Sequence, residues 1–109
     1  MSTNANLTTP IVSGKFLKHS SARKSIHIAV ESPEWFDWLE LPDSTIFYCN
    51  GYPYNYTARR ETRRNKHYWY AYMKLNDVLY KVYMGKSAKL TTDYIQKVIP
   101  QKLDDKYYS

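Results

Sequence analysis

The stretch from His67 to Met84 reads HYWYAYMKLNDVLYKVYM, with apolar and polar side chains alternating on both sides of Asn76-Asp77. Alternation with a period of two is typical of a half-buried strand. Asn and Asp tolerate the left-handed backbone that a two-residue turn requires. The pattern therefore predicts a β-hairpin with strands at residues 67–75 and 78–84.

The position of this turn decides which side chains share a face of the hairpin. One face is apolar and is expected to be core: Trp69, Ala71, Met73 and Leu75 lie opposite Met84, Val82, Tyr80 and Val78. The reverse face carries Tyr68, Tyr70, Tyr72 and Lys74 opposite Gly85, Tyr83, Lys81 and Leu79. Packing within a monomer does not require this face of tyrosine and lysine side chains. We therefore expect the face to be exposed and to bind a partner.

A third strand is predicted on the amino-terminal side of the hairpin, at residues 54–62. With residues 63–66 as the intervening turn, the register places Thr57 beside Tyr72, Arg59 beside Tyr70 and Glu61 beside Tyr68. All of these side chains then join the exposed face. Before this strand, Asn50-Gly51 predicts a further hairpin turn after a strand at residues 45–49.

Two helices are predicted from capping signals. Ser32 followed by Pro33 is typical of a helix start, and the segment EWFDWLEL then places its indoles on one side. Thr91 is the expected N-cap of a second helix, which Pro100 would end. The sequence thus predicts an α+β fold: a three-stranded antiparallel sheet packed on a C-terminal helix, with a short Trp-containing helix and a strand before it.

The chain of 109 residues has room for one core. We expect a single α+β domain over residues 25–99, a flexible basic lead over residues 1–24 and a frayed tail over residues 100–109. The lead is rich in Thr, Asn and Ser, and four basic residues would make it a loose basic arm: Lys15, Lys18, Arg23 and Lys24.

Positive charge is concentrated in one supersecondary unit. Residues 59–89 hold nine Lys and Arg against two acidic residues, a local net charge of +7, whereas the whole chain carries +6. The remainder is therefore close to −1. A charge confined in this way is typical of a surface that binds a polyanion.

Catalytic, metal-binding and membrane signals are weak. The lone Cys49 allows no internal disulfide, and the three histidines lie in separate segments. Glu34, Asp37 and Glu40 have the spacing of the solvated side of a helix, and the three glycines form no phosphate-binding loop. The start MSTNANLTTPIVSG has neither the charge nor the apolar run of a secretory signal. We expect a cytoplasmic protein that is not an enzyme, with no metal, cofactor, membrane partner or small-molecule substrate.

Four segments in order, SPEWFDWL, YTARRETRR, HYWYAY and LYKVYMGKSAKLT, resemble the small domain near the amino end of large LuxR-type, ATP-binding bacterial transcription regulators. The resemblance covers roughly residues 28–98. The matching positions are Thr57, Ala58, Arg59, Arg60, Glu61, Trp69, Ala71, Tyr72, Lys81, Tyr83, Gly85, Lys86 and Ser87. Asp77 stands where the family has a turn glycine, and Met73 stands where it has an arginine.

This resemblance implies regulation linked to DNA. Because the chain lacks the ATPase and helix-turn-helix parts of those regulators, it implies a free-standing version on a plasmid, a phage or another mobile element. The predicted order of three strands and a helix also resembles, more loosely, the arm-binding domains of tyrosine integrases and the three-stranded DNA-binding domains of plant transcription factors.

The sequence therefore predicts a double-stranded DNA-binding protein, a small transcriptional regulator or mobile-element accessory protein, that reads DNA with its sheet. The predicted contact residues are Thr57, Arg59, Arg63, Arg64, Lys66, Tyr70, Tyr72, Lys74, Lys81, Tyr83, Lys86 and Lys89. Two alternatives stay open. The same face could bind an acidic protein partner, as an interaction module or inhibitor, or it could bind single-stranded DNA or RNA by stacking bases on Tyr70 and Tyr72.

Overall fold

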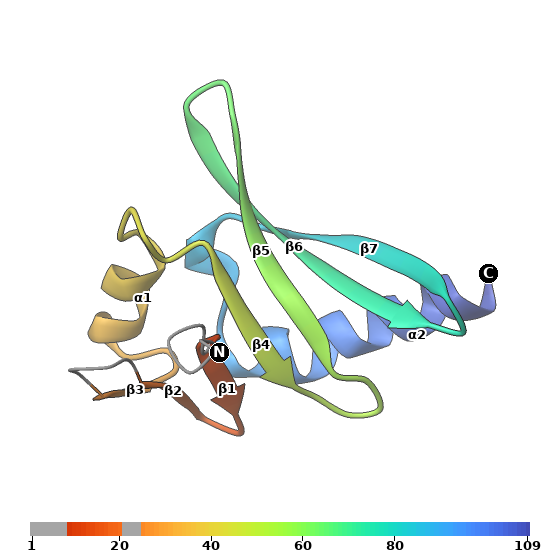
Figure 1. The fold of residues 1–109 in the computed structure, drawn as a ribbon, viewed down its shortest axis with the longest axis horizontal. Coiled ribbons are helices and arrows are strands. Elements are labelled where there is room, and N and C mark those ends of the chain that lie inside the picture. Colours follow the sequence, from red (N-terminus) through yellow and green to blue (C-terminus); the bar gives the residue numbers. More distant parts are fainter. Residues whose placement is uncertain (1–8, 21–24) are drawn as a thin grey trace, which may run out of the picture.

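The computed structural model describes residues 9–20 and 25–109, and within these residues it contains one seven-stranded mixed sheet (Figure 1). The strands are β1 (Ile11–Ser13), β2 (Phe16–Ser20), β3 (Ser25–Ala29), β4 (Ile46–Asn50), β5 (Tyr56–Arg63), β6 (Lys66–Leu75) and β7 (Val78–Gly85), in the spatial order β3-β2-β1-β4-β5-β6-β7. The helical elements are α1 (Pro33–Leu39), the short 3₁₀ helix η2 (Ser87–Lys89), the π-helical turn η3 (Tyr94–Val98) and α2 (Ile99–Tyr108).

The prediction of a three-stranded antiparallel sheet was wrong. Strands β5, β6 and β7 are antiparallel neighbours, but β4 pairs with β5, and β1 pairs in parallel with β4 and brings β2 and β3 into the same sheet. Strand β1 is only three residues long and pairs with residues 48–50, far along the chain. A strand this short has no readable periodicity, and a partner so distant leaves no local signal.

The two ends of the chain are also more ordered than predicted. Residues 11–13 and 16–20 of the supposed lead form β1 and β2, where Val12 and Leu17 are fully buried. Residues 100–108 of the supposed tail belong to α2, which buries Leu103. Arg23 and Lys24 of the predicted basic arm lie outside the described residues.

The central hairpin and its neighbour strand were predicted correctly. Asn76 and Asp77 occupy the left-handed turn, with φ of 51° and 65°, and Leu75 pairs with Val78. From there to Tyr70, which pairs with Tyr83, the register is the predicted one. A bulge between Trp69 and Tyr70 then pairs Trp69 with Gly85 instead of Met84, and β5 lies in the predicted register beside β6.

All helical elements pack on one face of the sheet, and the core lies between the two layers. In α1, Ser32 caps the first turn by accepting a hydrogen bond from the Trp35 N–H at 3.3 Å, as predicted. The rings of Trp35 and Trp69 pack against Phe47 with centroid distances of 5.5 and 5.3 Å. The buried apolar side chains stabilise the fold by removing their surface from water.

Pro100 does not end the second helix, because a π-helical turn precedes it. The Ile99 N–H bonds to the carbonyl of Tyr94, five residues back, and Pro100 has no N–H to offer to the Ile95 carbonyl. The buried Tyr56 hydroxyl donates to that carbonyl at 2.7 Å instead. Burial raises the pKa of Tyr56 well above its ordinary value, so the hydroxyl remains a donor.

The predicted two-residue turn at Asn50-Gly51 was wrong. Strand β4 ends at Asn50 and β5 begins at Tyr56, so five residues connect them. The Gly51 N–H bonds to the Asn55 side chain at 3.1 Å, which closes this longer loop. Pro53 lies inside the loop and lacks the N–H that a tight hairpin ladder requires.

Candidate nucleic-acid interface

We define the open face as the side of the sheet that faces away from the helices. In β5 to β7 it presents the side chains that alternate with the buried ones: Thr57, Arg59, Glu61, Tyr68, Tyr70, Tyr72, Lys74, Leu79, Lys81 and Tyr83. The structure therefore contains the predicted sheet face of tyrosine and lysine side chains. Tyr83 has 49% of its surface exposed, and no helix of the described residues covers this side.

Strands β5 and β6 continue beyond the sheet as a two-stranded arm. Strand β4 pairs with β5 only as far as Arg59, and β7 pairs with β6 only from Trp69, so residues 61–68 pair only with one another. We call this segment the ribbon. It projects from the sheet as the long green hairpin of Figure 1, and a rise of about 3.4 Å per residue makes it roughly 12 Å long.

The ribbon ends in a turn with an unfavourable residue. Arg64 and Asn65 have φ of 53° and 66°, the left-handed conformation that Gly and Asn tolerate and a long side chain does not favour. Arg63 and Lys66 pair directly before and after this turn. Three exposed cations therefore lie at the tip of the ribbon, Arg63, Arg64 and Lys66.

Glu61 lies at the centre of the basic open face. Its carboxylate accepts a hydrogen bond from the Tyr72 hydroxyl and forms ion pairs with Arg63 and Lys81, each at 3.3 Å. The Tyr72 hydrogen bond, followed by the bonds from the two cations, lowers the pKa of Glu61, so it is ionised at neutral pH. Sequence reasoning placed Glu61 on this face but gave it no role.

Arg63 and Lys81, together with Arg59, also lie over the tyrosine rings. The Lys81 ammonium lies 4.5 Å from the centroid of the Tyr70 ring and 5.3 Å from that of Tyr72. Arg63 lies 5.6 Å from the Tyr70 centroid, and Arg59 lies 5.9 Å from that of Tyr72. These distances lie within the cation–π range, so the rings attract the positive charges to this part of the sheet.

Two shallow hollows of about 350 and 320 Å³ lie on the open face and share Thr57 and Arg59. The first is lined further by Ile11, Ile46 and Tyr48 and the second by Tyr72, Lys74 and Leu79. Arg59 therefore lies between two depressions, within reach of a ligand that follows the sheet across its strands.

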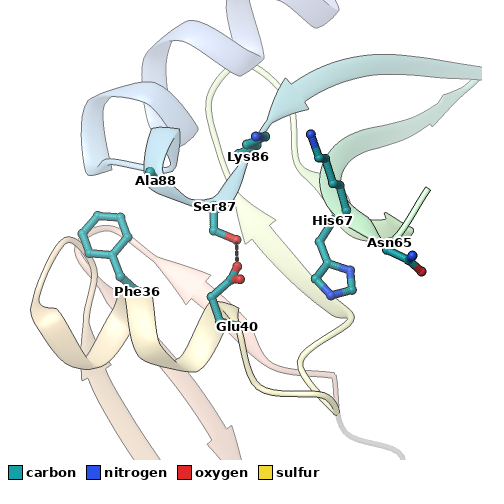
Figure 2. Close-up of a pocket in the computed structure, with 8 residues that line it drawn as sticks. Phe36, Glu40, Asn65, His67, Lys86, Ser87 and Ala88 are labelled. Atoms are coloured by element: carbon teal, nitrogen blue, oxygen red, sulfur yellow. Dashed lines mark hydrogen bonds between the residues drawn. The ribbon is translucent and has the colours of Figure 1, made fainter. Parts of the chain in front are cut away.

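A larger pocket of about 680 Å³ lies on the other side of the ribbon, between it and α1 (Figure 2). Phe36, Glu40 and Ala88 line it opposite the turn residues of the ribbon, and Lys66 and Lys86 contribute the cations. The buried Ser87 hydroxyl donates to Glu40 and accepts from the Trp69 indole N–H at 2.9 Å. This pocket joins three segments that lie far apart in the chain, so no local sequence pattern predicts it.

Ten of the predicted contact residues lie on the open face of β5 to β7 or at the tip of the ribbon. The other two do not join them. Lys86 lines the pocket beside the ribbon, and the Lys89 ammonium lies 5.8 Å from the Tyr94 ring on the helix side of the sheet. Arg60, counted in the basic stretch, points away from the open face and donates to the carbonyls of Leu39 and Pro42.

No protein-family model, curated protein or solved structure matches this chain. The described part of the chain holds no cluster of three or more His, Cys, Asp or Glu side chains that could bind a metal ion. In the same residues, no helix is long and apolar enough to cross a bilayer. The resemblance to LuxR-type regulators stays a prediction.

Proposed function

We propose that this protein binds double-stranded DNA by inserting the ribbon into the major groove. The major groove is about 12 Å wide and admits a two-stranded ribbon. Seven strands spaced about 4.8 Å apart span roughly 29 Å, too wide to enter it. The observation that carries the proposal is therefore the ribbon itself, a two-stranded projection with three cations at its tip.

In this arrangement the open face beside the ribbon contacts the sugar-phosphate backbone. Lys74 and Lys81 neutralise phosphates, the tyrosine hydroxyls donate to phosphate oxygens, and Arg59 has the forked geometry that reads a guanine edge. A role in transcription or on a mobile element rests on the family resemblance alone.

The geometry favours duplex DNA over a single strand. A base that stacks on Tyr70 or Tyr72 must displace the Lys81 ammonium, which lies over both rings. Phosphate contacts require no such displacement. An acidic protein partner would use the same cations, and a failure to bind duplex DNA would favour that class of partner.

The test is a fluorescence polarisation titration with a duplex, a single strand and an RNA of equal length. We expect the duplex to bind best, with a log-log salt slope of about −4 to −6 for roughly five to seven neutralised phosphates. The triple variant Arg63→Ala, Arg64→Ala, Lys66→Ala removes the cations of the ribbon tip and should lose at least about tenfold in affinity, with a slope shallower by about 2 to 3.

A matched control removes three exposed cations that lie away from the ribbon, through Lys15→Ala, Lys89→Ala and Lys97→Ala. It changes the net charge equally but should alter affinity far less. An equal loss in both variants would contradict insertion of the ribbon and leave only diffuse attraction. A flat salt response would contradict DNA binding itself and favour the acidic protein partner.

A further inference from the structure

A carboxylate at the centre of a surface that binds phosphates is unexpected, because it repels them. Glu61 holds this position on the first residue pair of the ribbon, opposite Tyr68. The two cations beside it, Arg63 and Lys81, are among those that the proposed function assigns to DNA. Any phosphate that these cations bind must therefore compete with Glu61.

The contacts of Glu61 are those of a bound phosphate oxygen. It accepts from a tyrosine hydroxyl, a guanidinium and an ammonium, which are the donors that contact DNA backbones in protein complexes. All three donors come from the open face, two from the sheet and one from near the ribbon tip.

These ion pairs are exposed enough to exchange. The side chains of Arg63 and Lys81 are 60% and 40% exposed, and that of Glu61 is 26% exposed. Exposed ion pairs contribute little net stability, because water and salt screen them. A DNA phosphate can therefore replace Glu61 as the partner of Arg63 or Lys81 without a large conformational change.

We propose that Glu61 is an internal phosphate mimic that occupies Arg63 and Lys81 in the free protein and so weakens binding to nonspecific polyanions. This inference rests on the proposed function. A duplex that also offers groove contacts to the ribbon overcomes the competition, whereas a polyanion that offers charge alone does not. Glu61 is thus a residue that sets specificity, through repulsion of the wrong ligand.

The variant Glu61→Gln tests this inference, because the amide keeps an acceptor for Tyr72 and removes the charge. We expect it to bind random-sequence duplex and heparin about 5- to 20-fold more tightly than the wild type, with a salt slope steeper by about 1 to 2. The ratio of affinities between a preferred duplex, selected from a randomised pool, and heparin should fall.

The matched control is Asp93→Asn, which removes a carboxylate from another exposed ion pair, with Lys97 at 3.7 Å, on the helix layer. It changes the net charge equally and should leave each affinity within about twofold, because Asp93 lies on the helix layer and forms its ion pair with Lys97, not with Arg63 or Lys81, and salt screens its effect at longer range. Melting temperatures of both variants establish that each is folded.

A second measurement uses the wild type and needs no variant. Titration with duplex, followed by NMR of the Arg63 side chain, should shift its Nε–Hε resonance as the guanidinium leaves Glu61. An unshifted resonance at saturation, or unchanged or weaker polyanion binding by folded Glu61→Gln, would overturn the inference while DNA binding stands. Absence of salt-dependent duplex binding by the wild type would instead overturn the proposed function, and the inference with it.

Discussion

Arg59 and Arg60 are adjacent, yet they lie on opposite faces of β5 and have different roles. Arg59 is exposed on the open face between the two hollows. Arg60 anchors the end of α1, where its guanidinium donates to the carbonyls of Leu39 at 2.7 Å and Pro42 at 3.2 Å. Orphan carbonyls at a helix C-terminus are stabilised by such a cation.

This difference predicts opposite phenotypes for two neighbouring substitutions. Arg60→Ala should lower the free energy of unfolding by about 1 to 3 kcal/mol, because it removes hydrogen bonds from a charged donor. Arg59→Ala should leave stability nearly unchanged but weaken binding to a preferred duplex and reduce its discrimination by about 1 to 3 kcal/mol. Urea denaturation and binding to a randomised duplex pool measure the two effects. Equal destabilisation by both variants would refute the face assignment.

At Arg64, we expect one substitution to increase the stability of the fold and to weaken DNA binding. Its φ of 53° is unfavourable for a side chain with Cβ, so Arg64→Gly should raise the free energy of unfolding by up to about 1 kcal/mol. The same substitution removes a cation from the ribbon tip and should weaken duplex binding. Asn65→Gly, at a φ of 66°, is the control that relieves a neighbouring turn position without loss of charge. If Arg64→Gly bound DNA as well as Asn65→Gly, the Arg64 charge would have no role in binding.

At the scale of elements, the Ile95 carbonyl of the π-helical turn accepts a hydrogen bond from the Tyr56 hydroxyl at 2.7 Å and a longer one from the Cys49 thiol at 3.9 Å. Tyr56→Phe leaves the buried Ile95 carbonyl without its hydrogen bond from Tyr56 and should cost about 1 to 3 kcal/mol in unfolding free energy. Tyr54→Phe is the control, since its hydroxyl bonds to Asp104 at a part-buried site. Thermal melts that rank Tyr54→Phe as the more damaging substitution would contradict this account.

The pH dependence of that hydrogen bond follows from the raised pKa of Tyr56. A raised folded-state pKa means that the neutral hydroxyl is favoured in the native protein. Its contribution is therefore fully present below the unfolded-state pKa of about 10 and is lost as the pH rises above it. The difference in stability between the wild type and Tyr56→Phe should accordingly shrink in strongly alkaline solution.

At the scale of the whole molecule, the amino-terminal strands complete the sheet and the core. Leu17 is fully buried, although its segment reads as a flexible lead. Leu17→Ala should cost about 2 to 5 kcal/mol, the range for a buried leucine. Lys18→Ala, one residue along and exposed, should cost far less. A melting temperature that Leu17→Ala leaves unchanged would show that β1 to β3 contribute nothing to the cooperative unit.

The sequence by itself determined the features that depend on neighbours in the chain. The alternation from His67 to Met84, the Asn76-Asp77 turn and the Ser32 cap predicted a hairpin, a register and a helix that the structure contains. Period and turn chemistry act over a few residues, so a single sequence records them. The open face of β5 to β7 followed from the same local pattern.

Tertiary structure alone decided what depends on distant segments. Parallel pairing of Ile11–Ser13 with β4 made the sheet seven strands wide within the described residues, and no local pattern encodes it. The ribbon exists because β4 and β7 end before residues 61–68. The helix continues past Pro100 with the Ile95 carbonyl hydrogen-bonded to the Tyr56 hydroxyl of β5. The contacts of Glu61 with Tyr72 and Lys81 likewise depend on the pairing of β5, β6 and β7. The spacing of these residues along the chain does not predict that their side chains meet.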